Sequence, residues 1–239
     1  MNSSELKGFL TGLIIGDGHI DKGITKRALR IKSINYEFIQ MIYEQLSKCT
    51  QFKLGIREID AYTSNGVNHK MNWELVVFAH PYFAKKYHHF YDDNAHRIVS
   101  KLALNWITPY GLANWYMSDG YICLVGKEKG RIYNRRMEIS TDRYSYKTVE
   151  KLCKMLFDRF GVVASIIKRG KRYRIRIKTE SYATFINLIE PYMVDSMKYK
   201  LYLGYNSKPK WMDDEMWSLQ QYLRSATALT GYAEGYDIV

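Results

Sequence analysis

The chain has 239 residues, of which 46% are hydrophobic and 25% charged, with 4 prolines and 16 glycines. This composition excludes disordered, collagen-like and low-complexity chains, and it fits a globular protein of one large domain or two smaller ones. Lysines and arginines number 36 against 24 aspartates and glutamates, and the formal net charge of +12 indicates a polyanionic partner such as nucleic acid.

An internal repeat is the first feature along the chain. Residues 10–18 read Leu-Thr-Gly-Leu-Ile-Ile-Gly-Asp-Gly, and residues 112–120 read Leu-Ala-Asn-Trp-Tyr-Met-Ser-Asp-Gly. Each motif is an apolar, helix-like stretch that closes on Asp-Gly, so Asp17 and Asp119 occupy matching positions.

The same order of elements is predicted behind each motif from the period of the apolar residues. After the first motif come a polar loop, a strand at 29–33, a helix at 36–48, strands at 52–59 and 73–78, and a helix at 82–91. After the second motif come a polar loop, a strand at 137–141, a helix at 146–159, strands at 162–168 and 172–178, and a helix at 182–192.

This duplication predicts an α+β fold of two pseudo-symmetric αββαββα halves. We expect the first half at residues 1–107 and the second at 108–205, where Thr108 and Pro109 suit the N-cap and first position of the second motif helix. No flexible linker separates the halves, so we expect them to pack directly against each other. Residues 206–239 lie outside the repeat and are expected to form a tail with a short helix.

Each motif aspartate stands just before a glycine at the carboxyl end of a helix-like stretch. A buried helix with small residues for close packing and a glycine cap is the simpler interpretation of one such motif. It does not explain why Asp17 and Asp119 both face the negative end of a helix dipole, where a carboxylate is destabilising. If the helices pack side by side, the carboxylates converge, and a divalent cation between them removes both penalties. Mg²⁺ commonly takes one or two protein carboxylates together with carbonyl and phosphate oxygens.

The paired motifs and the strand pattern behind them resemble the LAGLIDADG homing endonucleases, in the monomeric form that carries both motifs in one chain. The resemblance covers residues 6 to 203 or so and implies a DNA-binding saddle, with the motif helices packed at the interface between the halves. It implies that Asp17 and Asp119 are catalytic and bind the metal. The backbone carbonyls of Gly16 and Ser118 would complete the ligand set.

The resemblance also implies a basic residue near the end of each half, close to the scissile phosphate, which holds or polarises the attacking water. In the second half the run Met-Lys-Tyr-Lys-Leu at 197–201 gives this role to Lys200. In the first half the corresponding position falls at His96, with Arg97 next to it. A simple phosphate contact by a surface His or Arg is the alternative.

Basic and apolar side chains alternate along four predicted strands. Residues 172–178 read Arg-Tyr-Arg-Ile-Arg-Ile-Lys, a period of two that puts the cations on one face of the sheet. A solvated sheet face would explain one such strand, but four of them predict a concave surface that follows phosphates and reads base edges in the major groove. The residues expected to contact DNA are Lys26, Arg30, Lys32, Lys53, Arg57, Lys70, Arg136, Glu138, Lys168, Arg169, Arg172, Arg174, Arg176 and Lys178.

The predicted function is therefore that of a Mg²⁺-dependent, site-specific double-strand DNA endonuclease of the intron-encoded type. It would act as a monomer on a long asymmetric target and hydrolyse one phosphodiester on each strand. Two alternatives stay open: an RNA-binding intron maturase with the same fold, and a DNA-binding protein without catalytic activity. The presence of both Asp17 and Asp119 favours the nuclease, because a fold that only binds has no reason to carry their mutual repulsion.

The cysteines and apolar runs bear on the compartment. Cys49, Cys123 and Cys153 form no C-x-x-C pair, so neither a disulfide framework nor a Cys-based zinc site is expected. No apolar run approaches the roughly 20 residues that span a bilayer, and the N-terminus lacks a signal-peptide pattern. We expect a reducing intracellular location, in bacterial or phage-infected cytoplasm or in an organelle matrix.

Overall fold

The computed structural model describes residues 1–64, 67–125 and 134–201, so the tail expected at 206–239 lies outside the described residues. The first half contains α1 (Ser3–Ile15), β1 (His19–Ile20), β2 (Arg27–Ser33), α2 (Tyr36–Ser47), β3 (Leu54–Ile59), β4 (Tyr62–Ser64), β5 (Val67–His69), β6 (Asn72–His80), α3 (Pro81–Lys86), η1 (Tyr87–His89) and α4 (Lys101–Trp106). The second half contains α5 (Pro109–Asp119), β7 (Gly120–Val125), β8 (Asn134–Ile139), α6 (Tyr146–Phe160), β9 (Ala164–Arg169), β10 (Arg172–Ile177), η2 (Thr179–Ser181), α7 (Tyr182–Ile189), η3 (Glu190–Tyr192) and η4 (Asp195–Lys200).

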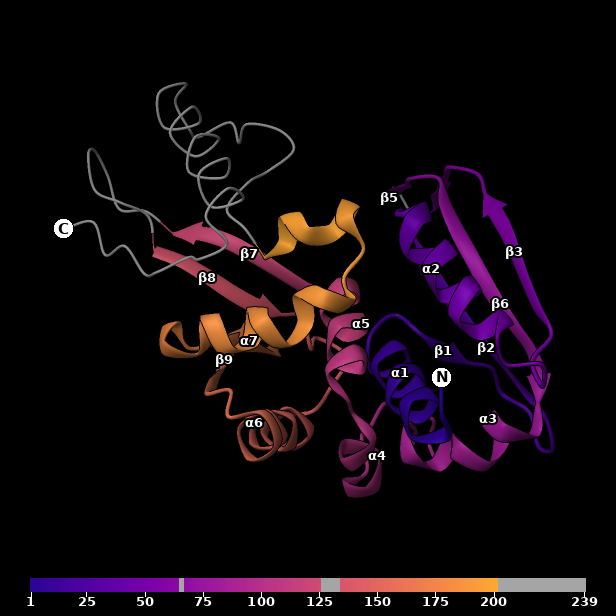
Figure 1. Ribbon diagram of the computed structural model, residues 1–239, viewed down its shortest axis with the longest axis horizontal. Helices are drawn as coiled ribbons and strands as arrows, with labels where there is room; N and C mark the ends of the chain where they lie inside the picture. Colours follow the sequence, from indigo (N-terminus) through magenta and orange to yellow (C-terminus); the bar gives the residue numbers. More distant parts are fainter. Residues whose placement is uncertain (65–66, 126–133, 202–239) are drawn as a thin grey trace.

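Two four-stranded antiparallel sheets repeat the same topology. Their strand orders are β1-β2-β6-β3 and β7-β8-β10-β9, so each strand of the first four-stranded sheet has a counterpart in the second. Figure 1 shows α1 and α5 side by side in the middle of the molecule, with one sheet on either side. The predicted α+β fold of two repeated halves is confirmed.

The two motif helices meet along glycines. A Cβ atom on Gly12 would lie 1.8 Å from the carbonyl oxygen of Gly111, and one on Gly111 would lie 2.2 Å from that of Gly8. The helix backbones are therefore in direct contact, which only residues without a side chain allow. The Thr108 hydroxyl accepts a hydrogen bond from the Gly111 amide at 3.2 Å, and Pro109 is the first helical residue, as predicted.

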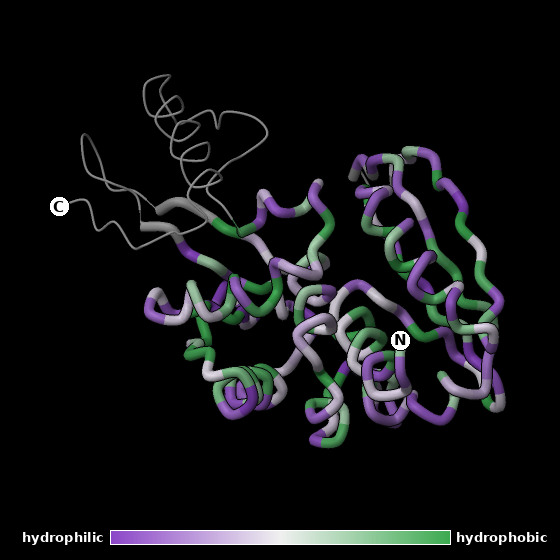
Figure 2. Tube along the Cα trace, in the orientation of Figure 1, coloured by the Kyte–Doolittle hydropathy of each residue, from purple (hydrophilic) through white to green (hydrophobic). Residues whose placement is uncertain are grey.

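Each sheet has one face buried beneath a helix, because its strands alternate apolar and polar residues. Helix α2 contacts β2, β3 and β6, and α6 contacts β9 and β10. The buried side chains of the first half include Phe38, Ile39, Ile42 and Leu46 of α2 and Leu29, Ile31, Leu75 and Val77 of the sheet. The hydropathy of the tube in Figure 2 changes sign along the strands of the first half in keeping with this division. The other face of each sheet, called the open face below, carries the basic residues.

The structure differs from the predicted elements in several places, among them the helix expected at 182–192, which is divided into α7 and η3. A strand, β1 or β7, follows each motif directly where a polar loop was expected, because its backbone pairs with β2 or β8. The segment 60–70 contains the hairpin β4–β5, and the helix expected at 82–91 is divided into α3 and η1.

Within the described part of the chain, no helix is both long and apolar enough to cross a bilayer. Cys49 and Cys153 are free thiols.

Candidate active site and nucleic-acid interface

The two motif aspartates lie at the carboxyl ends of the paired helices. Asp119 is the last residue of α5, and Asp17 follows Gly16, the residue that caps α1. Across the seam, the line along which α1 and α5 pack, a Cβ atom on Gly16 would lie 2.7 Å from the Cβ of Ser118. Helix packing thus brings all four residues of the expected metal site together.

The environments of the two carboxylates are unequal. The side chain of Asp119 is 11% exposed, whereas that of Asp17 is 42% exposed. Burial, followed by the nearby Asp17 carboxylate, raises the pKa of Asp119 to about 7. Its Oδ2 atom is buried and has no hydrogen-bond partner among the described residues. A buried carboxylate oxygen without a donor fits a cation ligand, because an anion left unpaired in the interior is costly.

Arg143 contacts both halves of this site. Its Nη2 atom lies 3.3 Å from Oδ1 of Asp17 and 3.8 Å from Oδ1 of Asp119, so one guanidinium bridges the two carboxylates. The same atom donates to the Gly16 carbonyl at 2.9 Å. A cation held by that carbonyl would compete with Arg143 for it. The described residues contain no group of three or more His, Cys, Asp or Glu side chains able to hold a metal, so further ligands would come from carbonyls, water or substrate.

One cation reaches the end of each motif helix. The Nζ atom of Lys200 donates to the Met117 carbonyl at 2.5 Å, and burial lowers the pKa of Lys200 to about 8 against the opposing effect of the two aspartates. On the other helix, Arg97 Nη1 donates to the Ile14 carbonyl and Arg97 Nη2 to the Gly18 carbonyl, both at 2.6 Å. Arg97 is therefore the structural counterpart of Lys200.

The expectation that His96 occupies this position is corrected by the structure. The His96 side chain is 74% exposed, and its Nδ1 atom lies 3.2 Å from Oδ2 of Asp92. Adjacent residues of an extended segment point in opposite directions, and the backbone bridge between Arg97 and Tyr91 turns Arg97 rather than His96 toward α1. The sequence placed the basic residue one position too early.

On the open face of the first sheet, basic residues surround a buried acid. Glu74 of β6 is fully enclosed, with Arg57 Nη2 at 2.5 Å, Arg30 Nη1 at 3.4 Å and Lys32 Nζ at 3.7 Å from its carboxylate. The predicted basic face therefore exists in this half, and its cations are held by an anion beneath them.

The second sheet has the same construction with different residues. Glu138 of β8 is fully buried, accepts a hydrogen bond from Arg176 Nε at 3.0 Å and lies 3.7 Å from Arg169 Nη2. The expectation that Glu138 contacts DNA is thus corrected, because its carboxylate lies beneath the arginines. Arg174 makes two hydrogen bonds with Asp142, at 2.9 and 2.7 Å. Neither Glu74 nor Asp142 was singled out from the sequence, since neither lies in a distinctive motif.

Lys168 is a further correction. It pairs with Tyr173 across β9 and β10, so the two side chains share one side of the sheet. The ring of Tyr173 packs 5.3 Å from that of Tyr146 of α6, which identifies this as the helix-covered side. Lys168 therefore does not belong to the open face.

The remaining expected contacts lie on or beside the open faces. Arg136 lies two residues before Glu138 on β8 and so shares its face of the sheet, and Arg172 lies 3.7 Å from Asp142. The residues just outside the strand ends are Lys26, Lys53, Lys70 and Lys178. They extend the basic surface beyond the strands.

Comparison with known proteins gives consistent matches over both halves. The sequence profile of the LAGLIDADG DNA endonuclease family matches residues 7–185. A probable intron-encoded endonuclease of Wickerhamomyces canadensis is 28% identical over 194 residues, which cover 80% of this chain and 81% of that protein. The cytochrome b mRNA maturase bI2 of Saccharomyces cerevisiae is 24% identical over 202 residues, covering 80% of this chain and 45% of the maturase. The solved structure of the homing endonuclease I-WcaI bound to its DNA recognition sequence aligns with a TM-score of 0.70 at 26% identity, covering 85% of this chain and 88% of that one.

Proposed function

This chain belongs to the LAGLIDADG DNA endonuclease family, and on that premise we propose that it cuts both strands of double-stranded DNA at a long asymmetric site, with Mg²⁺ as cofactor. The observation that carries the proposal is the meeting of Asp17 and Asp119 at the seam, where one oxygen of Asp119 is buried without a partner. Because both halves lie in one chain, a monomer presents two different basic sheets to one DNA molecule.

We assign the metal to Asp17 and Asp119, with the carbonyls of Gly16 and Ser118 as further ligands. The chemistry supplied by a bound divalent cation is polarisation of a phosphate oxygen and acidification of the attacking water. Arg143 keeps the two carboxylates together, since its guanidinium contacts both. Its role is that of a positioning residue.

We assign the scissile phosphates to Lys200 in one half and Arg97 in the other. With its pKa lowered to about 8, Lys200 can exchange a proton near neutral pH, whereas an arginine stays charged and can only donate hydrogen bonds. The two strands would therefore be cut at unequal rates.

The test is incubation with supercoiled plasmid carrying the host gene without the element that encodes this chain. In Mg²⁺ we expect one linear product, and in EDTA none. Asp17→Asn and Asp119→Asn should bind the same DNA in Ca²⁺ with an affinity close to wild type but leave it uncut. Loss of binding in both variants would make the aspartates structural, and cleavage in EDTA would refute the metal assignment.

A maturase function is the second candidate, because 80% of this chain is also similar to the yeast maturase, in a match that covers 45% of the maturase. It predicts tight binding of the encoding intron RNA and faster splicing of that RNA when the protein is added. Absence of plasmid cleavage together with such binding would favour it over the nuclease.

A further inference from the structure

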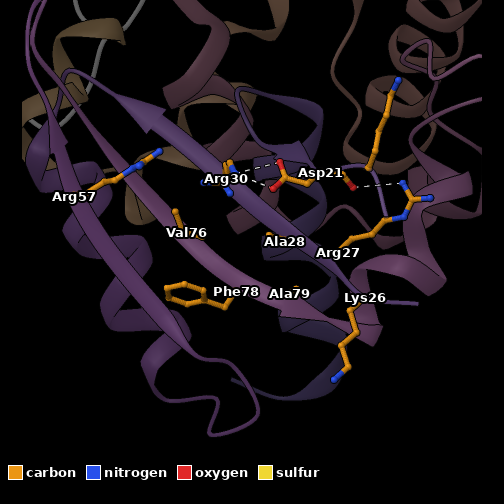
Figure 3. A pocket seen from close by; sticks show the side chains of 10 residues that line it. Asp21, Lys26, Arg27, Ala28, Arg30, Arg57, Val76, Phe78 and Ala79 are labelled. Atoms are coloured by element: carbon orange, nitrogen blue, oxygen red, sulfur yellow. Dashed lines mark hydrogen bonds and ion pairs between the residues drawn. The ribbon is translucent and has the colours of Figure 1, made fainter. Parts of the chain in front are cut away.

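The open face of the first sheet contains an apolar patch among its cations. Val76 and Phe78 of β6 and Ala28 of β2 lie on the same side of the sheet as Arg30 and Arg57, and all five line one pocket (Figure 3). Phe78 is 46% exposed, so nearly half of its surface is open to a ligand. Together with Ala28 and Val76, Phe78 makes a contiguous apolar patch within a basic sheet face, and such a patch marks a candidate contact site.

Phe78 is held in place by its neighbours. A Cβ atom on Gly55 of β3 would lie 3.2 Å from the ring, so the missing side chain makes room for Phe78 to cross that strand. Lys53, just before β3, places its Nζ atom 5.4 Å from the centroid of the Phe78 ring, a cation–π contact. Ala28 and Val76 form the floor of the patch and are almost completely buried. The apolar surface is thus formed before any ligand binds.

The second sheet has no equivalent patch on the corresponding strand. Along β10 the open face carries Arg172, Arg174 and Arg176, whereas β6 carries Glu74, Val76 and Phe78. The two strands occupy the same place in the order of their sheets. The two halves therefore present different chemistry to the bases.

Resting on the proposed function, we propose that Ala28, Val76 and Phe78 form a subsite for the C5 methyl group of a thymine in the first-half arm of the target. In the major groove, thymine is the base that presents an apolar group, and Ala and Phe side chains are suited to contact it. Arg57, Arg30 and Lys26 around the patch complement the surrounding phosphates and base-edge acceptors. An A·T pair is therefore specified here by a methyl contact rather than by a hydrogen bond.

The experiment begins with selection of bound duplexes from a synthetic, unmethylated random pool in Ca²⁺. In such a pool thymine is the one source of a C5 methyl group. The selection is then repeated with Arg57→Ala. The part of the consensus that changes is the first-half arm, which is the stretch of DNA bound by the first sheet. Finally, each thymine of that arm is replaced singly by deoxyuridine, and the affinity of the wild type, Phe78→Ala and Phe157→Ala is measured. Phe157 is an exposed phenylalanine of α6 and serves as the matched control.

We expect deoxyuridine at one position to weaken wild-type binding about fourfold, the factor that corresponds to about 0.8 kcal/mol for one buried methyl group. Phe157→Ala should keep this loss, and Phe78→Ala should abolish it. Specific binding with no deoxyuridine effect in that arm, or an equal effect in Phe78→Ala, would overturn the thymine subsite and leave the nuclease proposal standing. Failure to select any consensus would refute site-specific binding itself, and the subsite with it.

Discussion

Replacement of Asp119 by Asn should stabilise the metal-free protein in a pH-dependent way. Asp119 has a pKa of about 7 in the folded chain, against an ordinary value of 3.8, because it is buried beside Asp17. Asparagine has nearly the same shape but cannot ionise. The substitution therefore removes the cost of burying the charge and changes the packing little.

The sign follows from proton binding. Between pH 4 and pH 7 or so the folded state keeps a proton on Asp119 that the unfolded state has lost, so the free energy of unfolding of the wild type falls as pH rises through this range. At 1.36 kcal/mol per pKa unit, the full penalty is about 4 kcal/mol at pH 8 and about 1.5 kcal/mol at pH 5. The advantage of Asp119→Asn over the wild type should consequently grow by about 3 kcal/mol between these two pH values.

Urea unfolding in EDTA at both pH values measures this difference, since urea does not screen charges. Asp158→Asn is the control, because Asp158 is an exposed residue paired with Lys154 on α6 and its replacement should change stability by less than about 1 kcal/mol at either pH. A stability difference between Asp119→Asn and wild type that stays constant with pH would refute the assignment of Asp119 as a destabilised buried carboxylate.

Further substitutions test three other parts of the structure. Gly12→Ala should cost more than about 3 kcal/mol or prevent folding, because its Cβ would overlap the Gly111 carbonyl; an unchanged urea midpoint would contradict the close helix contact. Glu74→Gln should lower the free energy of unfolding by about 3 kcal/mol, since it leaves neighbouring cations around a neutral group, and unaltered stability at low salt would argue against that ion cluster. Arg97→Ala should make nicked rather than linear plasmid accumulate, while His96→Ala cuts normally; the reverse result would restore His96 to the site.

The sequence predicted the features that depend on local periodicity. The Asp-Gly ends of the motifs located both carboxylates, and alternation along β10 separated its arginines from its apolar residues. Features that depend on contacts between distant segments were not predictable in this way. Arg143 lies in a loop without a pattern and reaches the seam only because the halves pack together. The choice between His96 and Arg97 depended on a backbone bridge to Tyr91 that no local signal announces.

The anions beneath the basic faces affect how DNA binding depends on salt. Glu74, Glu138 and Asp142 already neutralise part of the charge of the arginines above them. An arginine paired with a protein carboxylate neutralises a phosphate only in part, so it displaces less than one counterion from the DNA. Counterion release is what makes the logarithm of the affinity fall with the logarithm of the salt concentration, with a slope of about 0.9 per neutralised phosphate. The salt slope of this protein should therefore be shallower than its number of surface arginines suggests. Affinity would then depend more on bases and geometry, and less on the ionic strength of the cell.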